Sequence, residues 1–71
     1  MKFRQGQLVI LRSEHPDVIC VWAWPDGEDV YSIPNETYGI YIGISSYQSP
    51  RHDVLVGEQI VSIPDADLVP A

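Results

Sequence analysis

The chain has 71 residues, enough for one domain with a single hydrophobic core and too few for a second. Ten acidic and four basic residues give a formal net charge of −6, which disfavours binding to nucleic acid or to an anionic membrane. No apolar run approaches the roughly 18 residues that span a bilayer, and the N-terminus turns polar too soon for a signal peptide. One cysteine excludes an internal disulfide. We therefore expect one domain, residues 1–71, in the cytoplasm.

Strand patterns and turn signals follow one another along the chain, with no helical period between them. We expect strands at residues 7–12, 18–24, 30–33, 37–45, 53–56 and 59–63. Gly57-Glu58 indicates a tight hairpin between the last two of these strands. Pro34-Asn35 ends the strand at residues 30–33. Residues 64–68, Pro64 to Leu68, read as one helical turn, because proline suits the first position and aspartates suit the positive end. A short extended piece, 69–71, follows.

The central strand alternates between isoleucine and other residues. Ile40, Ile42 and Ile44 recur at a spacing of two, which predicts that their face lies on the core. Gly39 and Gly43 leave the opposite face open to close approach by a neighbour. The predicted core consists of Val9 or Leu8, Val21, Ile40, Ile42, Val54, Val56, Val61 and Leu68. Replacing Ile42 by alanine is then expected to cost about 2–5 kcal/mol of stability.

Candidate catalytic and metal-binding groups are few. His15 and His52 are the only histidines; they are expected in different loops, and neither has a partner at a metal-ligand spacing. We interpret both as solvated loop residues. The loop 49–53 contains serine, histidine and aspartate, but crowding into one loop does not favour the geometry of a catalytic triad. Cys20, in an apolar strand, is predicted to be an inert buried thiol. We predict a protein that is not an enzyme and has neither cofactor nor metal.

Aromatic residues carry the strongest indication of binding. Strand alternation puts Trp22 and Trp24 on one face, while the opposite face of that strand is apolar enough to serve the core. Tryptophan is enriched at binding hot spots, although one or both rings could instead cover the core. The predicted binding residues are Trp22, Trp24, Tyr31 and Tyr41. We expect them to bind a protein partner or a second copy, in a two-fold homodimer.

Several segments together resemble the Src-homology-3-like small barrel. They are Gly6 before the apolar stretch 7–11, the glycine-rich strand 39–44, the hairpin 54–63 and the turn and strand 64–69. The chain is similar to small uncharacterised barrels of phages and environmental bacteria. The resemblance implies an all-β barrel of five to six short antiparallel strands with one helical turn near Pro64–Leu68. The aromatic residues do not follow the peptide-binding pattern of the signalling domains, so no binding residue is carried over, and the fold hosts many functions.

Two function classes remain. The first is a non-catalytic protein-interaction module, or an accessory or structural subunit. The second is an acidic mimic or inhibitor, whose negative charge blocks a basic, nucleic-acid-binding site on a partner. The acidic residues are dispersed along the sequence, which favours the interaction module.

Overall fold

The computed structural model describes residues 3–14, 17–23, 29–45 and 51–71. These residues form seven strands and one 3-10 turn: β1 (Leu8–Leu11), β2 (Val18–Ala23), β3 (Val30–Pro34), β4 (Thr37–Ile44), β5 (Arg51–Val56), β6 (Gln59–Pro64), η1 (Asp65–Asp67) and β7 (Leu68–Pro70). All pairings are antiparallel, and the strands make one sheet in the order β3-β2-β6-β5-β4-β1-β7. The predicted all-β antiparallel fold is confirmed, with seven strands instead of five to six.

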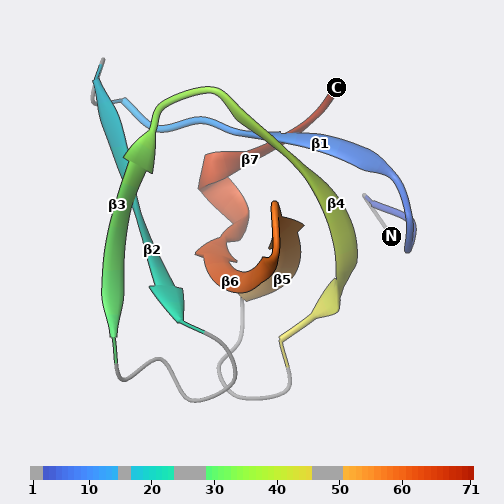
Figure 1. Ribbon diagram of the computed structural model, residues 1–71. Coiled ribbons are helices and arrows are strands. Elements are labelled where there is room, and N and C mark those ends of the chain that lie inside the picture. The colour runs from blue at the N-terminus through green and yellow to red at the C-terminus, as the bar shows by residue number, and fades with distance from the viewer. Residues whose placement is uncertain (1–2, 15–16, 24–28, 46–50) are drawn as a thin grey trace.

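The sheet curls round its core but stays open (Figure 1). β3 and β7 form its two edges and do not pair with each other, so the prediction of a barrel is wrong. The local reason lies in two strands. Among the described residues, β2 pairs with β6 only at Trp22 and Ala23, so its first half diverges from β6 while it stays paired with β3. β7 is three residues long and ends at Pro70, which has no N–H to offer a further strand.

The turns follow the local chemistry of the sequence. Gly57 adopts a φ of 62° between β5 and β6, as a hairpin with glycine at its first central position requires, so the predicted Gly57-Glu58 turn is confirmed. β3 ends at Pro34, and the following turn places Glu36 at a φ of 64°. The Asn35 side chain supports this turn by accepting from the Glu36 N–H at 3.0 Å. The helical turn predicted near residues 64–68 is η1.

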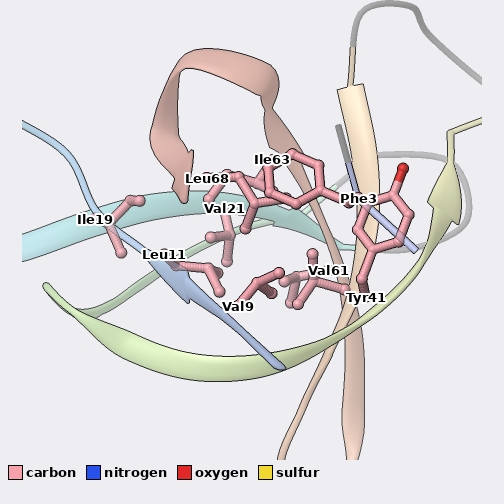
Figure 2. Close-up of a cluster of buried hydrophobic side chains, with 10 residues drawn as sticks. Phe3, Val9, Leu11, Ile19, Val21, Tyr41, Val61, Ile63 and Leu68 are labelled. Atoms are coloured by element: carbon pink, nitrogen blue, oxygen red, sulfur yellow. The ribbon is translucent and has the colours of Figure 1, made fainter. Parts of the chain in front are cut away.

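The inner face of the curled sheet carries the core (Figure 2). Ten hydrophobic residues are buried there: Phe3, Val9, Leu11, Ile19, Val21, Tyr41, Val54, Val61, Ile63 and Leu68. Figure 2 shows the rings of Phe3 and Tyr41 next to each other at one end of the cluster and Ile19 at the other. The predictions for Val9, Val21, Val54, Val61 and Leu68 are confirmed. Val56 is partly buried against the cluster.

The predicted inner face of β4 is wrong. Tyr41 is 1% exposed and Gly39 is buried, whereas Ile40 is 36% exposed and Ile42 only half-buried. The close approach of β5 decides the orientation, because a Cβ on Gly39 would lie 2.5 Å from Cγ1 of Val54. The inner face of β4 therefore has room for a glycine at this point and not for a branched side chain. The large cost expected for Ile42→Ala no longer follows.

Candidate functional site

The outer face of the sheet carries a continuous row of aliphatic side chains. Residues directly opposite each other in antiparallel strands point to the same side of a sheet. Leu8 of β1 lies opposite Ile40 of β4, and Ile40 lies opposite Leu55 of β5. Leu55 in turn lies opposite Ile60 of β6, so the row crosses four neighbouring strands. Leu8 is 47% exposed, Ile40 is 36% exposed, and the other two are half-buried.

A second row borders the first. Ile10, two residues after Leu8 and therefore on the same face, lies between Tyr38 of β4 and Val69 of β7. Tyr38 is 58% exposed, and the other two are half-buried. Both rows together make the outer apolar surface: Leu8, Ile10, Tyr38, Ile40, Leu55, Ile60 and Val69. Two adjoining rows make this surface contiguous and spread it over five strands.

Trp22 lies beside this surface on the same outer face. It is opposite Ser62, which lies two residues from Ile60 on β6. The guanidinium of Arg51 stacks 3.7 Å from the centre of the Trp22 ring. The same side chain donates from Nε to Ser62 Oγ at 2.8 Å and from Nη2 to the Ser62 carbonyl at 2.7 Å. Burial lowers the pKa of Arg51, although Asp67 opposes the shift. These contacts fix the position of a half-buried tryptophan ring.

The four predicted binding residues do not come together. Trp22 lies on the outer face, and Trp24 lies outside the described residues. Tyr31 lies opposite Val21 and therefore on the inner side, at edge strand β3, where it is 38% exposed. Tyr41 belongs to the core. Sequence reasoning missed the exposed aliphatic rows because their isoleucines and leucines have the same period as a core-facing strand.

A buried polar cluster lies on the inner face of the sheet, next to the hydrophobic core. Tyr41 and His52 are 2.8 Å apart between hydroxyl and Nδ1, and His52 Nε2 lies 2.8 Å from Asp65 Oδ1 on η1. Phe3 packs against both rings. His52 is 9% exposed and lies in β5, so its interpretation as a solvated loop residue is wrong; His15 lies outside the described residues.

The cluster has the chemistry of a structural contact. Burial, followed by the charges of Asp53 and Asp65, raises the pKa of Tyr41, so the phenol is held neutral. A neutral phenol is a poor nucleophile or base. In the segments that the structure describes, no group of three histidine, cysteine or acidic residues could hold a metal ion.

A groove of about 630 Å3 lies where the first half of β2 diverges from β6. Val18, Ile19 and Cys20 line one side, and Ala66 of η1 and Val69 of β7 are also in its lining. Cys20 is exposed, so the prediction of a buried thiol is wrong. Its Sγ lies 3.9 Å from the Ser32 hydroxyl. Both faces of this strand are apolar in sequence, but only one of them packs on the core, and Cys20 lies on the other, exposed face.

Comparison with protein-family models, curated proteins and solved structures finds no match. No family is therefore shown, and what the structure supports of the Src-homology-3-like resemblance is a small all-β antiparallel sheet. In the described ranges, no helix is long and apolar enough to cross a membrane.

Proposed function

We propose that the protein is a non-catalytic interaction module that binds another protein through the outer apolar surface. The observation that supports this most directly is the row of Leu8, Ile40, Leu55 and Ile60 across four strands. Single exposed apolar side chains are ordinary on protein surfaces, whereas contiguous patches usually mark contact sites. The adjoining Trp22 ring, which Arg51 holds in place, adds an aromatic anchor of the kind found at interface hot spots.

The charge of the chain indicates the kind of partner. A net charge of −6 favours a protein whose contact patch is apolar at its centre and basic at its rim. Opposite charges at the rim accelerate association and reject other acidic proteins, while the apolar centre supplies most of the affinity.

The acidic-mimic function has less support. Some of the acidic groups in the described part of the chain serve contacts within the fold. Glu36 pairs with Arg12 at 3.0 Å, Asp65 accepts from His52, and Asp53 is 8% exposed. We therefore favour the interaction module over a mimic of nucleic acid.

The test compares affinity capture by three immobilised forms of the full chain: wild type, the double variant Leu8→Ser/Ile40→Ser, and Ile44→Ser. Ile44 is the matched control, because it is 53% exposed and lies at the end of β4 outside the outer apolar surface. We expect a protein from the source organism that binds wild type and Ile44→Ser but not the double variant. All three forms are checked by circular dichroism. Equal capture by all three folded forms would contradict the proposal.

A further inference from the structure

We infer that two copies of the chain form a two-fold dimer in which their β3 strands pair antiparallel. This interface is separate from the outer apolar surface and does not depend on the proposed function. β3 is an edge strand, and no other strand of the described residues pairs with its open side (Figure 1). Its five residues carry no charge, Val30 is 60% exposed, and Tyr31 is 38% exposed. Natural edge strands are usually protected by charge, early proline or very short length, and β3 has proline only at its end.

The outward backbone groups of β3 follow from its register with β2. The Ala23 N–H donates to the Asp29 carbonyl at 2.8 Å, so this pair is a hydrogen-bonded pair of the ladder. Hydrogen-bonded and non-hydrogen-bonded pairs alternate along antiparallel strands. Tyr31, opposite Val21, is therefore bonded to β2, while Val30 and Ser32 direct their N–H and C=O groups away from β2. Two residues of β3 thus present both a donor and an acceptor at the open edge.

A second copy of β3 matches these groups. When a two-fold axis passes beside Tyr31, Val30 of one copy lies opposite Ser32 of the other, and each outward N–H meets an outward C=O. The two Tyr31 residues then form the non-hydrogen-bonded pair at the centre, on the inner side of the sheet. Cross-strand aromatic pairs of this kind stabilise antiparallel sheets. Asp29 falls opposite Ile33 of the second copy and not opposite another acid.

The other edge cannot continue the assembly. In β7 the Leu68 N–H is already bonded to the Asp65 carbonyl, and Pro70 has no N–H. The Arg12 N–H bonds to the Asp67 carbonyl, so by alternation the Val69 groups face β1. Within β7, no outward N–H is left to pair with a further strand. The association therefore closes as a dimer and does not extend into a filament.

Charge sets the conditions for the dimer. Each copy carries −6, so the two copies repel each other at low ionic strength. Salt screens this repulsion, with a Debye length of about 10 Å at 0.1 M. We expect the dimer to strengthen as salt rises, opposite to an interface held by ion pairs between unlike charges.

Sedimentation of wild type, Ser32→Ala and Ser32→Pro at low and high salt tests the dimer. The Ser32 N–H faces outward, so proline removes this donor without removing a β2–β3 hydrogen bond. We expect Ser32→Ala to dimerise like wild type and Ser32→Pro to lower the association constant by about tenfold or more, since two intermolecular bonds are lost. A wild-type chain that stays monomeric at high salt, or a Ser32→Pro dimer of unchanged strength, would overturn the inference.

Cross-linking tests the register and does not require a proline. In a Cys20→Ser background, Tyr31→Cys places two thiols at the central pair, within the Cα separation that a disulfide needs. We expect Tyr31→Cys to form a covalent dimer on oxidation, and Val30→Cys to form little, because the two Val30 positions are offset by about two residues, or about 7 Å, along the strands. The reverse preference would refute the register. A dimer abolished by Leu8→Ser/Ile40→Ser but not by Ser32→Pro would assign self-association to the outer apolar surface instead.

Discussion

The Tyr41 hydroxyl lies 2.8 Å from Nδ1 of His52, within the core of the sheet. On the other side of the ring, the Asp65 carboxylate accepts from His52 Nε2, which assigns a proton to that nitrogen. In the neutral imidazole, Nδ1 is then the acceptor and the Tyr41 O–H donates to it. The cluster connects the central strand β4 through β5 to η1 and satisfies polar groups that would be costly to bury alone.

Replacing Tyr41 by phenylalanine should remove this donor while keeping the ring packed against Phe3. His52 Nδ1 then loses its partner in a buried site, so we expect a loss of about 1–3 kcal/mol in the free energy of unfolding. Urea denaturation measures it. The matched control is Tyr38→Phe, because Tyr38 is 58% exposed; its stability should change by less than about 0.5 kcal/mol. Equal effects of the two variants would show that the hydrogen bond has no net stabilising role.

Stability should fall at alkaline pH in a way that depends on Tyr41. Burial raises its pKa in the folded state above the ordinary value of 10.0, so the unfolded chain releases this proton first. The contribution is fully present below about pH 10 and is lost as the pH rises through the folded-state value. We expect the free energy of unfolding to fall above pH 10, with a steeper slope in wild type than in Tyr41→Phe. Parallel curves for the two proteins would contradict the assignment.

Two glycines of β4 should respond differently to alanine. On Gly39 a Cβ would lie 2.5 Å from Val54 Cγ1 and 3.0 Å from the Leu55 carbonyl, so overpacking should destabilise the protein by about 1–3 kcal/mol. On Gly43 a Cβ would meet nothing within 4 Å. Gly43→Ala should be neutral, or stabilise by up to about 1 kcal/mol through the lower entropy of the unfolded chain. Thermal melting of both variants decides; a tolerated Gly39→Ala would mean that β5 does not approach this closely.

Two leucines of β1 test which face of the sheet is inside. Leu11 is fully buried, whereas Leu8 is 47% exposed on the outer face. Leu11→Ala should cost about 2–5 kcal/mol, because a cavity adds to the lost transfer energy. Leu8→Ala should change stability by less than about 0.5 kcal/mol. A larger loss for Leu8→Ala would place the outer row in a folded core and remove the basis of the proposed binding surface.

Local sequence determined where several of the turns fall. Gly57 marks the hairpin because glycine readily adopts the positive φ of a tight turn. Pro64 marks the 3-10 turn because its fixed φ suits the start of a helical turn. The apolar composition of the strands likewise predicts them from the sequence. The candidate site was predicted only in part: Trp22 lies on the outer face as expected. Ile40, which the sequence assigns to the core, lies on that outer face as well.

The tertiary structure decided which side of β4 is buried, where His52 lies and whether the sheet closes. An alternating strand has the same period on both faces, so the isoleucines at 40, 42 and 44 cannot by themselves show which side is inside. The register with β5 makes the choice, because Val54 fills the space next to Gly39 and His52 provides the hydrogen-bond partner of the buried Tyr41 hydroxyl. Both conditions join residues 11 or more positions apart in the chain, and such contacts exist only once the strands have paired.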